Sequence, residues 1–359
     1  MSKICFLAQF PPPIHGLSKA VETLYNSTAL KNEFETDAIN LTCNKKFIKN
    51  VFRLIRDKSD LYYFTISQTR GGNIRDLLIL WIIRMKRKKC VVHLHGGYYR
   101  VLVDNVLGPV QRKANYKAIS IIDLAIVLGQ SFKHIFEGML PDEKIVAVPN
   151  CADDEVVISN EEFARKIKEG KTRSIKRILY LSNMIETKGY RAALQLAKAE
   201  KQWVEEGKSP RFHFEFAGAF FDSQEQRYFE QYIAENSLDS VLTYYGVVSG
   251  KDKRNLLKQA DWLVLPTRYP REGQPICILE GMANGLAIIS TDYAGIPDLV
   301  KDGENGILIQ DSDCLPKLEE IYAANLADMQ EQNREIALCE YTQEKYISRM
   351  IDSFRKVLT

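Results

Sequence analysis

Short apolar runs alternate with helical segments along almost the whole chain, and this alternation constrains the fold more than any other feature of the sequence. Several runs are apolar without interruption, which is typical of parallel strands buried on both faces. Strands that alternate with helices in this way predict an α/β fold with doubly wound sheets. The expected strands are 4–9, 34–42, 61–66, 90–95, 123–128 and 145–148, and then 177–182, 212–217, 242–245, 262–266, 287–291 and 306–309.

The pattern breaks between Cys151 and Lys176, where acidic residues and then a Lys- and Arg-rich stretch contain no strand candidate. A chain of 359 residues also suits two domains better than one. We therefore predict two Rossmann-like domains, over 1–150 and 177–340, joined by a linker over 151–176. Helices are expected at 17–30, 45–58, 72–88, 107–119 and 131–139, and near the C-terminus over 335–358.

The cysteines and histidines indicate no metal or disulfide chemistry. The seven cysteines are scattered without a Cys-x-x-Cys pair, so we expect the reduced thiols of a cytoplasmic protein. Only His93 and His95 lie close together, and no third metal ligand accompanies them. Residues 1–10 lack the basic leader and cleavage site of a signal peptide. The longest apolar run, Leu77–Ile83, is far shorter than the roughly 20 residues that a membrane-spanning helix needs.

Charge is distributed unevenly. Residues 1–150 contain 22 Lys and Arg against 12 Asp and Glu, a balance of +10, whereas the remainder contains 27 against 34, a balance of −7. A basic half suggests an anionic partner for that half alone. No stacking-aromatic or helix-turn-helix pattern accompanies the charge, so we expect a membrane surface or a lipid phosphate rather than nucleic acid.

Two basic stretches contribute most of this charge. Residues 45–56 combine cations with regularly spaced apolar residues, which is typical of an amphipathic helix that lies on anionic lipid. Residues 84–89 form a second basic cluster. The alternative for 45–56 is a helix packed on the core with a solvated basic face.

The segment Thr267–Gly285 contains the most informative pattern. It follows the expected strand 262–266, so its loop lies at the carboxyl edge of a parallel sheet, where open α/β folds bind ligands. Pro275 suits the first turn of a helix. The next two amides, of Ile276 and Cys277, would then lie at the positive end of that helix and favour a phosphate.

Two carboxylates, Glu272 and Glu280, flank this helix start, and Gly273 between them allows a ligand close to the backbone. Carboxylates accept hydrogen bonds from hydroxyls, so one carboxylate could hold each end of a nucleotide-sugar. The alternative is that Glu272 is a solvated loop residue and Glu280 a surface residue of the helix. We do not expect a glycosidase pair, because this spacing does not ensure carboxyls ~5–9.5 Å apart.

The glutamates are followed by a stretch that resembles the donor domain of the family 4 retaining glycosyltransferases, including members that build bacterial capsule, exopolysaccharide or O-antigen. The stretch comprises Gly281–Gly285, Ile288–Asp292, Gly295–Asp298 and Asp302–Gly306. This resemblance implies a GT-B fold, in which two Rossmann-like domains face a cleft. It also implies a donor on the second domain, an acceptor on the first, and a final helix over 341–359 that crosses back to the first.

Four shorter segments extend the resemblance over nearly the whole chain. Leu181–Gly189 is similar to the segment that places an Arg and a Lys on the donor diphosphate, and Gly246–Val248 to the turn that binds the base. Pro11–Gly16 resembles the glycine-containing first loop, and His93–Gly97 the loop whose histidine touches the donor sugar.

The resemblance implies catalytic roles for Glu272, His95 and Lys188. Asn183 stands where many members have Arg, so another cation, such as Arg268 or Arg271, or the helix amides would have to contribute more. Gly16 has a structural alternative as the opening residue of a helix, and His95 as a core histidine. The implied donor-binding residues are Gly16, Asn183, Lys188, Val248, Gly273, Gln274, Pro275, Ile276, Cys277 and Glu280.

The expected function is transfer of a sugar, with retention, from a UDP-linked nucleotide-sugar to a hydroxyl acceptor, without a cofactor or metal. The expected partners are this donor, a glycan or lipid-linked acceptor and the anionic inner membrane face, and nucleic acid is not among them. One alternative is a GT-B-fold sugar-nucleotide epimerase or an inverting transferase, which the anomericity of the product would distinguish. Another is a catalytically silent scaffold that binds nucleotide without transfer.

Overall fold

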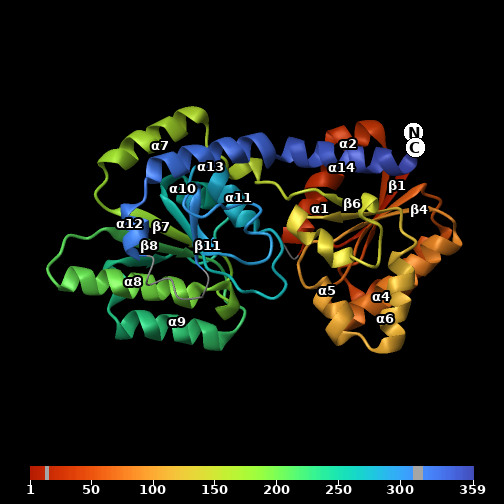
Figure 1. The fold of residues 1–359 in the computed structure, drawn as a ribbon, viewed down its shortest axis with the longest axis horizontal. Coiled ribbons are helices and arrows are strands. Elements are labelled where there is room, and N and C mark those ends of the chain that lie inside the picture. Colours follow the sequence, from red (N-terminus) through yellow and green to blue (C-terminus); the bar gives the residue numbers. More distant parts are fainter. Residues whose placement is uncertain (13–15, 310–317) are drawn as a thin grey trace. The chain divides into compact units, whose positions relative to one another are not determined.

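The computed structural model describes residues 1–12, 16–309 and 318–359. These residues form two compact units, each built around a six-stranded parallel sheet (Figure 1). The first unit contains Met1–Asn150, Arg271–Gln274 and Gln343–Thr359, and the second contains Cys151–Pro270 and Pro275–Thr342. The α/β class with doubly wound sheets is therefore confirmed. No helix in the described part of the chain is long and apolar enough to span a bilayer.

The sheet of the first unit has the order β2-β1-β3-β4-β5-β6, with every neighbouring pair parallel. Every residue of β3 and β5 is buried, which explains why neither strand contains a charged residue. The strands are β1 (Lys3–Ala8), β2 (Glu35–Asn40), β3 (Leu61–Thr65), β4 (Lys89–His93), β5 (Leu124–Val127) and β6 (Ile145–Ala147). The helices are α1 (Gly16–Asn26), α2 (Thr28–Glu33), α3 (Phe47–Arg56), α4 (Arg70–Met85), α5 (Tyr99–Val101) and α6 (Pro109–Ile119).

The sheet of the second unit has the order β12-β11-β10-β7-β8-β9. In Figure 1, α8 and α9 cover one face of this sheet, and α10, α11 and α13 cover the other. The strands are β7 (Lys176–Leu181), β8 (Phe212–Ala217), β9 (Leu242–Tyr244), β10 (Trp262–Leu265), β11 (Ala287–Thr291) and β12 (Gly306–Ile309). The helices are α7 (Asn160–Thr172), α8 (Tyr190–Glu205), α9 (Ser223–Glu235), α10 (Gly250–Gln259), α11 (Ile276–Ala283), α12 (Leu318–Ala323) and α13 (Leu326–Glu340).

The last helix, α14 (Gln343–Leu358), belongs to the first unit. Phe354 is fully buried, and its ring centre lies 5.7 Å from that of Tyr63. Arg355 pairs with Glu33 of α2 at 2.6 Å. The end of the chain therefore completes the core of the unit that contains its beginning.

Four segments differ from the sequence prediction. The expected helix 335–358 is divided between α13, which ends at Glu340, and α14, which begins at Gln343. The expected linker over 151–176 contains α7, which begins with a capping box between Ser159 and Glu162, and it forms part of the second unit. The expected helix 17–30 divides at Ser27, whose hydroxyl caps α2 by accepting from the amide of Leu30. The expected helix 131–139 is a run of 3₁₀ turns over Gln130–Phe136.

Candidate functional site

In the second unit, the strand order reverses between β7 and β10, and this switch point is where open α/β sheets bind ligands. Two of the predicted residues follow β7: Asn183 is exposed and Lys188 is half-buried. The Lys188 ammonium lies 4.8 Å from the centre of the Tyr269 ring, which belongs to the loop after β10. The cation therefore lies beside the switch point.

Backbone contacts join the two loops at this point. The amide of Arg268 donates to the Thr187 carbonyl oxygen at 2.7 Å. Gly189 has a φ of +85°, and a Cβ there would lie 2.2 Å from the Pro266 carbonyl oxygen, so only glycine fits. Arg268 and Arg271 were suggested as substitutes for the missing arginine. Of these two, Arg268 is the one whose backbone is hydrogen-bonded to the loop that contains Lys188.

Helix α11 begins immediately after Pro275. The first bond within the turn runs from the Ile278 amide to the Pro275 carbonyl oxygen, at 3.1 Å. The amide of Ile276 precedes this bond and needs an acceptor from outside the helix. Cys277 is half-buried rather than enclosed. The start of α11 therefore has the geometry that favours an anion.

Glu280, one turn into α11, is 2% exposed and lies 2.6 Å from the ammonium of Lys253 in α10. The alternative of a surface glutamate is therefore wrong for Glu280. Sequence reasoning missed Lys253, because it lies in a helix without a recognisable motif. The sequence offered one clue to Lys253, namely that it lies seven residues after Gly246, the first residue of the predicted base-binding turn.

The turn that contains Val248 lies at the carboxyl end of β9, in the same unit. Gly246 has a φ of +69°, and its carbonyl oxygen accepts from the Gly218 amide at 2.8 Å. The Tyr244 hydroxyl donates to the Gly218 carbonyl oxygen, also at 2.8 Å. Val248 itself is half-buried, so it has apolar surface that a flat ring could contact.

In the first unit, residues 271–274 pack closely against the loop after β4. The Gly97 amide donates to the Glu272 carbonyl oxygen at 2.8 Å. A Cβ on Gly273 would lie 2.9 Å from the carbonyl oxygen of His95, so the two backbones touch. Glu272 is 6% exposed, which rules out the alternative of a solvated loop residue. The structure thus brings His95, Glu272 and Gly273 together.

Gln274 anchors the C-terminal end of segment 271–274 through hydrogen bonds. Its side-chain oxygen accepts from the Asn150 amide at 2.7 Å, and its carbonyl oxygen accepts from the Asn150 side chain at 3.1 Å. Both residues are buried. Gln274 therefore positions the loop from inside the unit.

His95 is half-buried, and its ring centre lies 3.8 Å from that of the fully buried His93. The Tyr63 hydroxyl lies 2.8 Å from His93 Nδ1. Burial and the neighbouring His95 hold the pKa of His93 well below its usual range, so this ring is neutral at pH 7. Gly16 begins α1, and residues 13–15 of the first loop lie outside the described residues.

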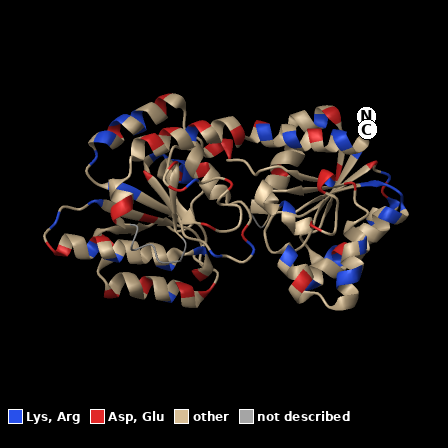
Figure 2. Ribbon diagram, viewed as in Figure 1, with Lys and Arg blue, Asp and Glu red and all other residues tan. Residues whose placement is uncertain are grey.

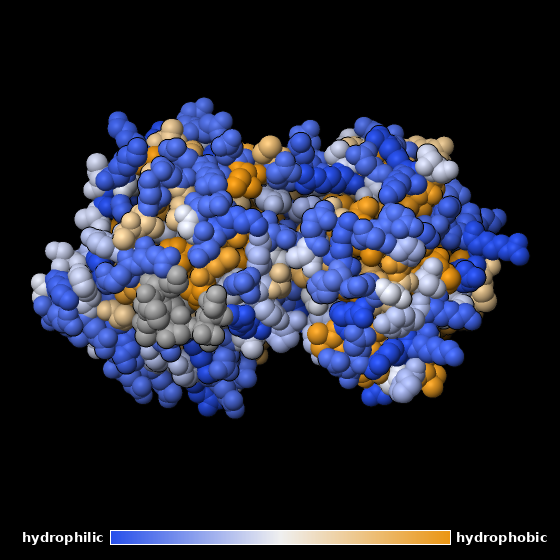
Figure 3. All heavy atoms as spheres, in the orientation of Figure 1, coloured by the Kyte–Doolittle hydropathy of each residue, from blue (hydrophilic) through white to orange (hydrophobic). Residues whose placement is uncertain are grey.

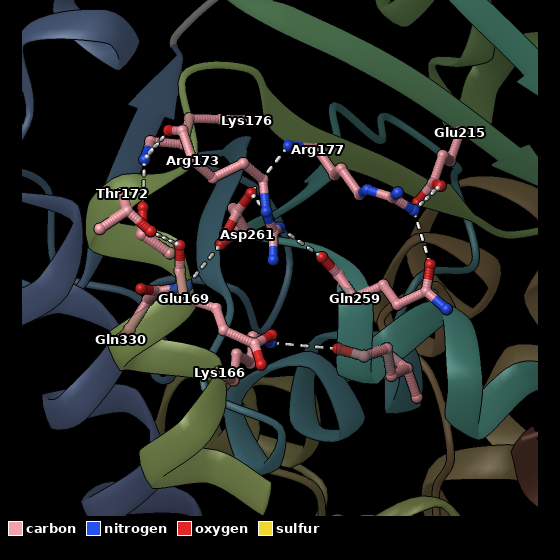
Figure 4. Close-up of polar contacts among 12 residues, drawn as sticks. Lys166, Glu169, Thr172, Arg173, Lys176, Arg177, Glu215, Gln259, Asp261 and Gln330 are labelled. Carbon is pink, nitrogen blue, oxygen red and sulfur yellow. Dashed lines mark hydrogen bonds and ion pairs between the residues drawn. The ribbon is translucent and has the colours of Figure 1, made fainter.

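Sequence reasoning also missed a buried polar network around Asp261, at the opposite edge of the second sheet (Figure 4). Asp261 is 1% exposed and accepts from the Arg173 guanidinium at 3.1 Å and from the Arg177 amide at 2.8 Å. Lys166, 4% exposed, donates to the carbonyl oxygens of Leu257 and Asn284 at 3.1 and 2.8 Å. These are the C-terminal ends of α10 and α11, where a cation is favourable, so Lys166 fixes the helices that contain Lys253 and Glu280.

The Lys166→Met variant is expected to lose a pH dependence of stability. Burial lowers the pKa of Lys166 to about 7, against about 10.4 in an unfolded chain. The unfolded state therefore binds more protons between these values, and stability should rise with pH there by up to about 1.4 kcal/mol per unit. Urea unfolding at pH 7, 8 and 9 measures the difference. The exposed Lys168→Met is the control, and equal pH slopes in wild type and Lys166→Met would contradict the assignment.

The chain is similar to known proteins in sequence and in fold. Residues 160–335 match the family model described as glycosyl transferases group 1. The amylovoran biosynthesis glycosyltransferase AmsK of Erwinia amylovora is 26% identical over 160 residues, which are 44% of this chain and 37% of that protein. The chain thus spans little more than a third of the length of the first relatives that it matches.

One further relative and one solved structure match more of the chain. The UDP-Gal:alpha-D-GlcNAc-diphosphoundecaprenol alpha-1,3-galactosyltransferase of Escherichia coli is 26% identical over 306 residues, 83% of this chain and 73% of that protein. The structure of Anabaena HepE in complex with UDP and glucose superposes with a TM-score of 0.72 at 15% identity, covering 99% of this chain and 100% of that one.

The two parallel sheets and these structural neighbours define a two-domain GT-B fold. Residues 160–335 are similar in sequence to the glycosyl transferases group 1.

Proposed function

We propose that the chain is a retaining glycosyltransferase that moves a sugar from a nucleotide-sugar to a hydroxyl acceptor. The observation that supports this best is Glu280, a carboxylate that lies almost fully buried one turn into α11 and is paired with Lys253 at 2.6 Å. An ionised carboxylate can accept hydrogen bonds from two neighbouring hydroxyls, and ribose has such a pair of hydroxyls. The relatives are named as glycosyltransferases, which favours sugar transfer as the reaction.

The donor that we propose is UDP-linked. The Escherichia coli relative is named for UDP-Gal, and Anabaena HepE was solved with UDP and glucose. In this chain, the turn over Gly246–Val248 would hold the base and Glu280 the ribose. Lys188, Arg268 and the Ile276 amide would neutralise the diphosphate, so that no metal ion is required for this charge.

Glu272 and His95 are the residues that we propose for the sugar. Glu272 precedes Pro275 by three residues, so the chain holds the two within about 10 Å of each other. A donor whose diphosphate lies at the start of α11 would therefore have its sugar within reach of this carboxylate. As the glycosidic bond breaks, negative charge grows on the leaving diphosphate, and the cations there stabilise it.

For the acceptor, we propose a lipid-linked glycan of surface polysaccharide synthesis, reached by the first unit from a membrane surface. Helix α3 has two apolar stripes: Phe47, Val51 and Leu54 are buried or half-buried, whereas Ile48, Phe52 and Ile55 are 73%, 57% and 53% exposed. The second stripe is exposed beside Lys45, Lys46 and Lys49, which are exposed too. Exposed apolar residues next to cations are what an interfacial helix presents to anionic lipid.

The Glu280→Ala variant is expected to bind free UDP about 10 to 100 times more weakly than wild type. Loss of hydrogen bonds to a charged acceptor costs about 1.5–3 kcal/mol, and the ribose contact does not depend on the sugar. Calorimetry with UDP alone measures it. The matched control is Glu162→Ala, which removes another carboxylate paired with α10, through Arg254 and Lys258. Unchanged UDP affinity in Glu280→Ala would remove Glu280 from the site.

A further inference from the structure

A cavity of about 590 Å³ opens in the first unit where α4 ends and β4 and β5 begin. This volume is in the range of small-molecule sites, about 300–1,000 Å³. Its walls include Leu80, Trp81 and Ile122, and its cations come from residues 84–89. Gly16 and the His95 loop follow the carboxyl ends of β1 and β4, so the cavity lies at the other edge of this sheet from these residues.

The cavity has a surplus of positive charge. Lys88 and Lys89 each pair with an aspartate, Asp60 and Asp123, at 3.2 Å. Arg84 and Arg87 are exposed and line the cavity, and no aspartate or glutamate of the described residues pairs with either of them. In Figure 2, Lys and Arg gather at the start of β4 in this unit.

Arg87 also has an unusual backbone. Its φ is +53°, in the left-handed region that is unfavourable for a residue with a side chain. Its amide donates to the Arg84 carbonyl oxygen at 2.9 Å, so a tight turn follows α4. This turn places Arg84 and Arg87 on the same cavity.

The same turn is fastened to α3. The Lys86 ammonium donates to the carbonyl oxygens of Leu54 and Ile55 at 2.6 and 3.1 Å, and also to that of Asp57. The exposed apolar stripe of α3 ends at Ile55. Figure 3 shows hydrophobic residues reaching the surface of this unit among hydrophilic ones. Hydrogen bonds of Lys86 therefore connect the turn that lines the cavity to the end of the stripe.

We propose that this cavity binds the phosphate headgroup of an anionic glycerophospholipid, with Arg84 and Arg87 on the phosphate and Trp81 and Ile122 against the start of the chains. A guanidinium forms two parallel hydrogen bonds to a phosphate, whereas the apolar wall has no role for a free inorganic ion. The proposal rests on the membrane contact proposed for α3. It adds a specific headgroup site to that contact.

Trp81 allows the site to be tested without a membrane. The other two tryptophans, Trp203 and Trp262, belong to the second unit. We expect dihexanoyl phosphatidylglycerol, titrated below its micelle concentration, to change the tryptophan fluorescence of the full chain with saturation. Dihexanoyl phosphatidylcholine should not, and Trp81→Phe should abolish the signal. An equal response to inorganic phosphate would make this a free-phosphate site and overturn the lipid proposal.

Arg84→Gln/Arg87→Gln should weaken this titration at least tenfold, since each change removes charge-assisted hydrogen bonds to the phosphate. The charge-matched control, Lys31→Gln/Lys113→Gln, removes two exposed lysines of the same unit outside the cavity and should titrate as wild type. Equal losses in both variants would overturn the proposal.

A third variant separates the cavity from α3. Lys45→Gln/Lys46→Gln/Lys49→Gln should release the chain from vesicles of 30% phosphatidylglycerol in phosphatidylcholine and leave the soluble titration intact. Arg53 is kept, because it pairs with Asp37 at 2.6 Å. If wild type ignores these vesicles but saturates with the soluble lipid, the headgroup site stands and the membrane contact of α3 fails. No response to the soluble lipid overturns the headgroup site.

Discussion

Replacement of Lys188 by alanine is expected to lower the turnover number about a hundredfold and to weaken donor binding by less than tenfold. Charge on the diphosphate grows as the glycosidic bond breaks, so a cation beside it stabilises the transition state more than the bound donor. Asn183 supplies no charge, which leaves Lys188 as the main cation after β7. Steady-state kinetics with a saturating nucleotide-sugar measure both quantities.

A second lysine of the same unit provides the control for Lys188. The ammonium of Lys198 lies 5.9 Å from the centre of the Tyr232 ring, so Lys198→Ala removes a similar cation–aromatic pair from α8. This variant should keep its turnover number within about twofold, because Lys198 lies more than two turns into α8, beyond the loop that contains Lys188. An effect of Lys188→Ala that is confined to the Michaelis constant would contradict the role in the transition state.

Glu272→Ala is expected to lower turnover by about 10- to 100-fold while free UDP binds nearly as in wild type. The lost hydrogen bond to a charged carboxylate concerns the sugar alone. The loop itself should keep its place, because its anchors are the Glu272 carbonyl oxygen on the Gly97 amide and Gln274 on Asn150. Turnover assays and calorimetry with UDP together test this. Equal losses for both ligands would mean that the roles of Glu272 and Glu280 are assigned wrongly.

Most of the strands could be predicted from the sequence because burial on both faces makes them largely apolar, as in β5. The helix α7 could not, although its capping box Ser159 to Glu162 is visible in the sequence. Its buried Lys166 looks like a surface residue, and only the carbonyl oxygens of Leu257 and Asn284, about 90 and 120 positions further along, explain its burial. Long-range polar contacts of this kind leave no local pattern.

Only the part of the candidate site that forms a local sequence motif could be predicted. The glutamates and the helix start at Pro275 form a local motif, so their positions could be predicted. Lys253 could not, because its pairing with Glu280 depends on how α10 and α11 pack. The attachment of residues 271–274 to the first unit depends on backbone contacts with Gly97 and Asn150, which no sequence pattern encodes.

The orientation of α3 is a further example. An amphipathic pattern predicts one apolar face, and the sequence left open whether that face is packed or exposed. The structure contains both: Leu54 is 2% exposed, whereas Phe52 is 57% exposed. Six apolar positions in twelve residues were too many for one face, and a second stripe follows from that count.

Incubation with a panel of nucleotide-sugars, read by release of nucleoside diphosphate and by the anomeric configuration of the product, tests the proposed function most directly. With a polyprenyl diphosphate-linked sugar as acceptor, we predict that at least one UDP-sugar is consumed, that the product keeps the donor's anomeric configuration, and that Glu272→Ala and Lys188→Ala each suppress the release. An inverted product would contradict the retaining mechanism. Tight binding of UDP without release from any donor and acceptor would contradict glycosyl transfer itself.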